Sequence, residues 1–263
     1  MSVFVAEELS EVLNTKVVIG RINMGLLNRI IIDDVLLDDQ SGQEMLKVTR
    51  LSAKFDIMPF FKGKISISSV QLFGFNINLR KETPDSPPNF KFVLDAFASK
   101  DTVKKENSLD LRINSILIRR GRMSYHVLSE EETPGKFNAK HIQLQNIIAN
   151  ISLKALSKDS LNLGIKRLSL DEKASGFSLK KMSLKLVANN KQTNIDNFTI
   201  ELPETSLKLD TIHLEYDSLK AFDRFTEQVH FSFRTLPSQV TLKDISPFVP
   251  ILSHFKEPVT LDM

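Results

Sequence analysis

Cysteine and tryptophan are both missing from this chain of 263 residues, and tyrosine occurs only twice. Without cysteine there can be no disulfide, no thiolate metal site and no cysteine nucleophile, a composition that suits the cytosol and the periplasm equally. No run of about 18 apolar residues occurs, so we expect nothing here to span a membrane. The segment 2–8 has no basic start and carries two early acids, which is unlike a secretory signal peptide. We therefore expect a cytosolic protein or an excised piece of a larger one.

The chain also has no large excess of positive or negative charge. Lys and Arg number 35 against 32 Asp and Glu, a net charge of +3, and no long basic run is interleaved with aromatic residues. Nucleic acid is therefore not an expected partner. The 41% hydrophobic and 25% charged residues are ordinary for a folded protein. All-β proteins of this length are often undivided, and we expect one elongated β domain over residues 1–263.

A four-place apolar pattern recurs along the chain: apolar residues alternate with polar ones, skip two positions, and alternate again. Its cleanest copy is Ile65, Ile67, Val70 and Leu72. Further copies begin at Val17, Ile30, Leu111, Leu163, Phe177 and Leu207, with weaker ones at Leu46 and Ile142. Chance supplies some of these, but copies with only polar or glycine residues between the apolar places begin at Ile65, Leu163, Phe177 and Leu207, where about one is expected. We interpret the repeat as real but degenerate.

The pattern is typical of a strand with one dry and one solvated face, because successive side chains point to opposite sides. The doubled polar pairs Ser68-Ser69, Lys166-Arg167 and Lys180-Lys181 would place the next apolar residue on the wrong face. A β-bulge absorbs the extra residue and bends the strand. Repeated bulges predict a mainly β fold: a long, curved, antiparallel-type sheet whose concave side is apolar.

Helices and turns are expected only at the joints of this sheet. An amphipathic helix within residues 1–15 covers 2–14 and ends at Asn14, and other helical patterns cover 58–63, 89–98, 218–228 and 245–255. The turn signals are Gln40-Ser41-Gly42, Arg120-Gly121, Thr133-Pro134-Gly135, Ala174-Ser175-Gly176 and Asn189-Asn190.

Residues with the spacing of a catalytic or metal site are scarce. The histidines lack the HxxxH, HxH and HExxH spacings, so we expect isolated surface or strand-edge histidines at positions His126, His141, His213, His230 and His254. The neighbouring carboxylates Asp33-Asp34 and Asp38-Asp39 would face opposite ways on a strand and are interpreted as turn or solvated residues. GxSxG and P-loop motifs are missing as well. We predict no catalytic residue, no metal, no cofactor and no enzymatic activity.

The apolar face has two possible uses. It could be the sealed core of an ordinary β-sandwich or barrel, or the lining of an open groove that accepts acyl chains. Smooth aliphatic residues without tryptophan, and a repeat that continues toward both ends, favour the groove. The candidate lining is Ile65, Ile67, Val70, Leu72, Leu111, Ile113, Ile116, Ile118, Leu163, Ile165, Leu168, Leu170, Leu179, Met182, Leu184, Leu207, Leu209, Ile212 and Leu214.

The first hundred residues resemble a known family. The stretch 9–35, with Leu13-Asn14-Thr15-Lys16-Val17 and Asn28-Arg29-Ile30-Ile31-Ile32-Asp33, is similar to the region after the membrane anchor in AsmA-like proteins, TamB-type members in particular. The stretch 51–80, with Phe60-Phe61-Lys62-Gly63-Lys64-Ile65, and the segment 89–97 also resemble that family. Beyond residue 100 the likeness is only a β-rich texture.

The resemblance implies a periplasmic protein that is tethered to the inner membrane of a diderm bacterium. Such a protein would form a taco-shaped trough with an apolar interior and serve phospholipid transport to the outer membrane and outer-membrane assembly. The family's anchor helix and C-terminal region have no counterpart here, so we expect an N-terminal piece of a longer bridge.

Two alternatives to a lipid-binding protein remain open, and both are structural or protein-binding modules. A structural, assembly or adhesive β-module would use the same apolar residues as a sealed core, without lipid. An assembly factor would instead add partner strands at its open sheet edge.

Overall fold

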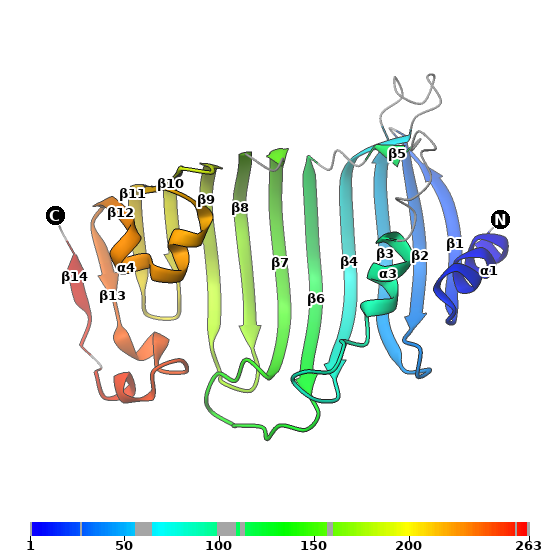
Figure 1. Ribbon diagram of the computed structural model, residues 1–263, viewed down its shortest axis with the longest axis horizontal. Helices are drawn as coiled ribbons and strands as arrows, with labels where there is room; N and C mark the ends of the chain where they lie inside the picture. Colours follow the sequence, from blue (N-terminus) through cyan, green and yellow to red (C-terminus); the bar gives the residue numbers. More distant parts are fainter. Residues whose placement is uncertain are drawn as a thin grey trace. The chain divides into compact units, whose positions relative to one another are not determined.

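The computed structural model describes residues 2–26, 28–55, 65–98, 109–110, 114–156, 160–255 and 257–261. The expected fold class is confirmed: the chain is mainly β, with 59% strand and 16% helix, and most neighbouring strands pair antiparallel (Figure 1). Two compact units divide the chain, Met1–Ile147 with Glu172–Ala174, and Ile148–Asp171 with Ser175–Met263. We call them unit 1 and unit 2. The single elongated domain stays a prediction.

Unit 1 begins with a helix and continues as a sheet. Its elements are α1 (Ser2–Leu13), β1 (Val17–Gly25), β2 (Arg29–Asp38), β3 (Glu44–Phe55), β4 (Ile65–Lys81), α3 (Lys91–Ala98), β5 (Leu109–Asp110), β6 (Ser115–Val127) and the first part of β7 (His141–Leu156). The order β1-β2-β3-β4 is antiparallel, but β4 and β6 are parallel neighbours. This pair departs from the antiparallel expectation, because the connection through α3 returns the chain in the same direction.

Unit 2 contains the rest of β7 and a second run of strands. Its elements are β8 (Ser160–Glu172), β9 (Ser178–Asn189), β10 (Gln192–Glu201), β11 (Ser206–Tyr216), the 3₁₀ turn η2 (Leu219–Arg224), α4 (Phe225–Gln228), β12 (Val229–Thr235), β13 (Ser238–Val240), η3 (Leu242–Ile245), η4 (Pro250–His254) and β14 (Val259–Leu261). Strands β8 to β11 pair in chain order, and β11 pairs with both β12 and β13.

Most of the predicted joints are confirmed. The patterns 2–14 and 89–98 are helices α1 and α3, and 218–228 is η2 followed by α4. The expected helix over 245–255 is wrong: η3 ends at Ile245, residues 246–249 form turns, and η4 begins at Pro250, because Pro247 and Pro250 lack the N–H groups that a helix needs. The pattern 58–63 lies outside the described residues. The turn expected at Arg120-Gly121 is also wrong, since both residues lie inside β6.

The predicted bulges are present. Ile165 of β8 pairs with Leu184 of β9, whereas Leu168, three residues on, pairs with Met182, only two residues on. The extra residue falls at Lys166-Arg167, so the apolar residues before and after it stay on one face. Register shifts also occur at the other two doubled polar pairs, Ser68-Ser69 in β4 and Lys180-Lys181 in β9.

Several strands also contain a residue in the left-handed conformation. These residues are Asp34 (φ 56°) in β2, Gly74 (φ 63°) in β4, Arg120 (φ 55°) in β6, Asn146 (φ 54°) in β7 and Asn197 (φ 52°) in β10. In unit 1 the flanking pairs place Asp34, Thr49 and Gly74 at one level of three adjacent strands. A left-handed residue interrupts the pleat and bends a strand. The sheet of unit 1 therefore has a crease across its strands.

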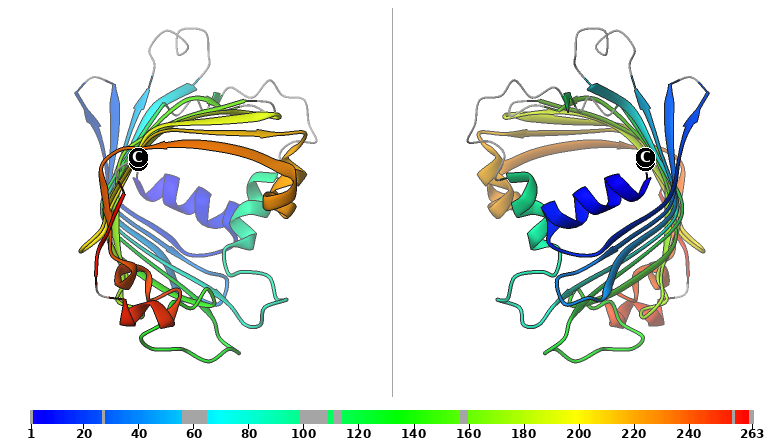
Figure 2. Two further views of the ribbon diagram at one scale, coloured as in Figure 1. Left: turned by 90° about the vertical axis from the view of Figure 1, so that its left-hand side faces the viewer. Right: turned by 90° about the vertical axis from the view of Figure 1, so that its right-hand side faces the viewer.

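Helix α1 packs on the apolar face of unit 1. Ala6 and Leu13 form a buried cluster with Val17, Ile19 and Leu37. Apolar side chains of α3 and of the segment before it pack against the same cluster. Figure 2 shows α1 and α3 on the concave side of the bent strands of this unit. The apolar face is therefore the concave face of unit 1, and the helices cover part of it.

A buried carboxylate fastens the β2–β3 turn to the end of β4. Asp39 is 2% exposed; its Oδ1 accepts hydrogen bonds from Ser41 Oγ (2.7 Å) and from the backbone N–H groups of Ser41 and Gln43, and its Oδ2 accepts from Asn89 Nδ2 (3.1 Å). Arg80 Nη2 lies 2.7 Å from Oδ2. Burial opposes ionisation, but the hydrogen bonds outweigh it and hold the pKa of Asp39 below its usual value. Asp39 is a turn residue, as predicted, but it is not solvated.

The left-handed conformation inside a strand can be tested at Asn197 in β10 of unit 2, whose side chain is exposed. Asn197→Val should lower the free energy of unfolding by about 1–2 kcal/mol, because a β-branched residue is strained at positive φ. Asn197→Gly should be tolerated within about 0.5 kcal/mol. The measurement is urea unfolding, with Thr199→Val as the control on the same strand. Equal stability of Asn197→Val and Thr199→Val would contradict a left-handed residue at this position.

The carboxylate network can be tested with Asp39→Asn, which turns an amide N–H group toward hydrogen-bond donors. We expect a loss of about 2–4 kcal/mol at pH 7, against a small effect for the half-buried neighbour in Asp38→Asn. The folded-state pKa of Asp39 is depressed, so its stabilisation is present above about pH 4 and is lost as the pH falls through that pKa. Urea midpoints of wild type and Asp39→Asn should therefore converge below pH 4. A gap that stays constant down to pH 2 would show that the charge of Asp39 is not stabilising.

Candidate functional site

An apolar row crosses five adjacent strands of unit 2. The directly paired residues are Leu163 of β8, Leu186 of β9, Ile195 of β10, Ile212 of β11 and Phe233 of β12. Residues that lie opposite one another on neighbouring strands share a face of the sheet. With strands about 4.8 Å apart, the row extends about 19 Å across the sheet. One face of unit 2 is therefore apolar over the width of five strands.

Two further rows run beside the first. One joins Leu161, Ala188, Thr193, Leu214 and Phe231, and the other joins Leu168, Met182, Ile200 and Leu207. Thr193 is the polar member, and its Oγ1 lies 2.8 Å from the hydroxyl oxygen of Tyr216. This bond satisfies the threonine hydroxyl within the protein. The rows together form a continuous surface, which we call the unit 2 apolar face.

The candidate lining residues of unit 2 lie on this face, and they are neither sealed nor fully exposed. Of those between Leu163 and Leu214, only Leu179 is buried, at 9% exposure, and the others are half-buried. Phe231 and Phe233 at the β12 end are each 54% exposed, with nearly parallel rings whose centroids lie 6.3 Å apart. A sealed core would bury such residues almost completely. Their role as a lipid lining stays a prediction.

A short helical segment sits at one end of this face. Ala221 of η2 forms a buried cluster with Tyr216 and Val229, against which Leu214 packs. The ring contacts continue from Tyr216 through Phe222 to Phe225 and on to Phe231. The segment therefore covers the face near β11 and β12 and leaves an exposed aromatic border.

The remaining candidates belong to unit 1. Leu72 pairs with Ile118 and Val70 with Ile116, so these four half-buried residues extend two apolar rows across β4 and β6. Ile65 and Ile67 belong to β4, but their side chains fall outside the described part of the chain, and Leu111 and Ile113 lie outside it entirely.

Sequence reasoning missed several residues of the unit 2 apolar face. They are Leu161, Leu186, Ile195, Phe198, Ile200, Phe231 and Phe233. Strand β10 carries only Ile195, Phe198 and Ile200 in phase, because the fourth apolar place is occupied by Thr193. A search for three apolar residues around a two-residue break would have found it.

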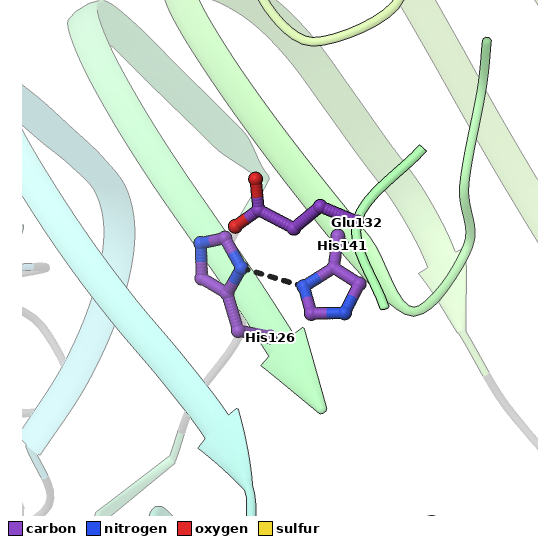
Figure 3. Close-up of side chains that lie close together, drawn as sticks. All are labelled: His126, Glu132 and His141. Atoms are coloured by element: carbon purple, nitrogen blue, oxygen red, sulfur yellow. Dashed lines mark hydrogen bonds between the residues drawn. The ribbon is translucent and has the colours of Figure 1, made fainter. Parts of the chain in front are cut away.

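Two histidines come together at the joint between β6 and β7 (Figure 3). His126 near the end of β6 and His141 at the start of β7 have Nδ1 atoms 3.0 Å apart. Glu132, on the connecting loop, directs its carboxylate toward His126, and the three candidate ligand atoms lie within 4.8 Å of one another. His141 is 6% exposed. The expectation of isolated surface histidines is therefore wrong for this pair.

Comparison of the sequence with protein-family models and with curated proteins finds no match to either. Among the described residues, no helix is both long and apolar enough to cross a membrane.

Proposed function

We propose that this protein binds lipid acyl chains on the apolar face of its bent sheet and lets them slide along it without catalysis. The observation that carries this proposal is the set of half-exposed apolar rows from β8 to β12. A methylene group gains about 0.8 kcal/mol when it leaves water for an apolar surface. Movement between equivalent apolar rows costs little by comparison, so transfer along the face needs no chemical step.

The chemistry of the face favours acyl chains over a polar ligand. Its members are aliphatic and phenylalanine side chains, and the hydroxyl of Thr193 is bonded to Tyr216. Such a surface offers contact without directional hydrogen bonds, and a hydrocarbon chain needs only contact. Headgroups would remain in water beyond the open side of the sheet.

The cellular setting is part of the same proposal and depends on the resemblance to AsmA-like and TamB-type proteins. In that setting the chain belongs to a periplasmic bridge that is tethered to the inner membrane. It would carry phospholipid toward the outer membrane and support envelope assembly, with a possible outer-membrane assembly partner.

The test compares two double variants on one strand. Ile195→Asp with Ile200→Asp places two charges on the apolar face of β10, whereas Asn194→Asp with Thr199→Asp places two charges on its opposite face. All four positions are half-buried and uncharged, so the change in net charge and the strand are matched. A second inward pair, Ile165→Asp with Leu168→Asp, samples β8 on both sides of its bulge.

The measurement is native mass spectrometry with lipid extraction on protein purified from a bacterial host. Wild type and the outward variant should carry phospholipid at near-stoichiometric amounts, and each inward variant should lose it about tenfold or more, because a charge beside an acyl chain is costly. Circular dichroism checks that the variants are folded. A lipid-free wild type, or a folded inward variant that keeps its lipid, would refute the proposal. Complete unfolding of both inward pairs would instead favour a sealed structural module.

A further inference from the structure

The histidine pair has a defined arrangement of protons. The Nε2 atom of His141 lies 2.9 Å from the backbone carbonyl oxygen of Glu130. A carbonyl oxygen can only accept, so His141 in its neutral form carries its proton on Nε2 and has a lone pair on Nδ1. That lone pair faces Nδ1 of His126 at 3.0 Å, so His126 Nδ1 is the donor of this hydrogen bond. One proton thus lies between two nitrogen atoms that are both able to bind a metal, and an ion that binds both of them replaces this proton, which is released to solvent.

This arrangement is the usual one around a metal-binding histidine. Such a residue donates its second N–H group to a carbonyl or carboxylate, which fixes the ring and leaves the other nitrogen free to coordinate. The Glu130 carbonyl does this for His141, and the burial of His141 prevents its ring from turning away. The hydrogen bond from His141 to the Glu130 carbonyl therefore supports a ligand role for His141, independently of the short distance between the two rings.

The loop that carries Glu132 is held on both sides. Asn138 Nδ2 donates to the carbonyl of Glu131 at 3.1 Å, and Lys136 N donates to the carbonyl of Thr133 at 3.3 Å. The N–H group of Gly135 bonds to the carbonyl of Ala174 at 2.9 Å. These bonds set the backbone at Glu132, while its exposed side chain can still adjust. The nearby Lys140 is paired with Glu130 at 2.6 Å, which offsets its charge.

We propose that His126 Nδ1, His141 Nδ1 and the Glu132 carboxylate bind a divalent transition metal ion, with Zn²⁺ as the best match. Zinc takes imidazole and carboxylate ligands at about 2.0–2.2 Å, so tetrahedral ligand atoms lie about 3.3 Å apart. The histidine nitrogens are already near this separation, and a small movement of the Glu132 side chain completes the set. Two imidazole ligands disfavour Mg²⁺ and Ca²⁺, which prefer oxygen. Water would occupy the fourth position.

The ion would link the β6–β7 connection to the strands on which it begins and ends. In metal-free protein the Nδ1–Nδ1 hydrogen bond joins His126 to His141 but does not reach Glu132. The metal adds that third attachment and so fixes the side chain of Glu132, which the hydrogen bonds of the loop leave free to adjust. This binding is independent of the acyl-chain proposal, because none of the three residues belongs to the apolar rows.

The test uses the full chain, purified without a histidine tag and stripped with a chelator, and titrates it with Zn²⁺ in a calorimeter. Wild type should bind one equivalent with micromolar or tighter affinity. Glu132→Gln should weaken binding about tenfold or more, whereas Glu131→Gln, an equal charge change at the exposed neighbour, should not. His126→Ala should abolish binding, and His254→Ala, which removes an exposed histidine elsewhere, should leave it intact.

Cobalt substitution gives a second measurement with a geometric signature. Co²⁺ in wild type should show the intense visible absorption of a four-coordinate site, and His126→Ala should lose it. Circular dichroism confirms that each variant is folded. No binding by wild type, equal effects of Glu132→Gln and Glu131→Gln, or a spectrum that survives His126→Ala would each overturn the proposal.

Discussion

The constraint behind this fold is that each strand must keep its apolar side chains on one face while it bends. Strict alternation satisfies the first requirement only in a strand without interruption. The bends at Asp34, Asn146 and Asn197 coincide with the two-residue break of the repeat. The break therefore does two things at once: it admits a left-handed residue that turns the strand, and it restores the phase of the apolar residues after the turn. Asparagine, aspartate and glycine suit such positions because they tolerate positive φ.

A sheet made in this way is stabilised more by the pairing between its strands than by other elements that pack on its faces. Ladder hydrogen bonds join neighbouring strands, and each apolar cross-strand pair adds about 0.2–1 kcal/mol. In unit 1, α1 and α3 add a buried cluster, and the network around Asp39 holds the β2–β3 turn against the segment before α3. In unit 2 the short η2–α4 segment covers only one end of the apolar rows. Half-exposed rows are thus compatible with a folded sheet, because the pairing between strands stabilises the sheet where no second layer buries its apolar face.

The sequence predicted the local features well because each has a short-range signal. The doubled pair Lys166-Arg167 marks its bulge directly, and the spacing of Leu9 and Val12 marks α1. Pairings between distant segments were not predictable. The parallel β4–β6 pair depends on the path of a long connection. The residues Arg120-Gly121 have the composition of a turn, but Gly121 is required inside β6 for another reason: a Cβ there would lie 2.4 Å from the ring of Phe75.

For the candidate sites too, the sequence predicted the features with a short-range signal and not the contacts between distant segments. The residues of the unit 2 apolar face were largely predictable, since the repeat gives their phase. His126 and His141 were not, because they lie 15 positions apart in the sequence and come together only where β6 and β7 pair in the folded sheet. The burial of Asp39 was hidden for a similar reason: its partners Arg80 and Asn89 come from sequence more than 40 residues away.

A surface on which hydrocarbon slides must be uniform as well as apolar, since one unsatisfied polar group would trap water and interrupt contact. Thr193 is the one position of the second row of unit 2 where a polar group could interrupt the apolar surface. Its hydroxyl is bonded to Tyr216, whose own hydroxyl donates to the carbonyl of Asn189 at 2.8 Å. Within the described part of the chain, no buried side-chain polar atom lacks a partner. The polar positions of the described sheet are therefore satisfied internally or by solvent, and the face between them is apolar from one row to the next, as the proposed sliding of acyl chains requires.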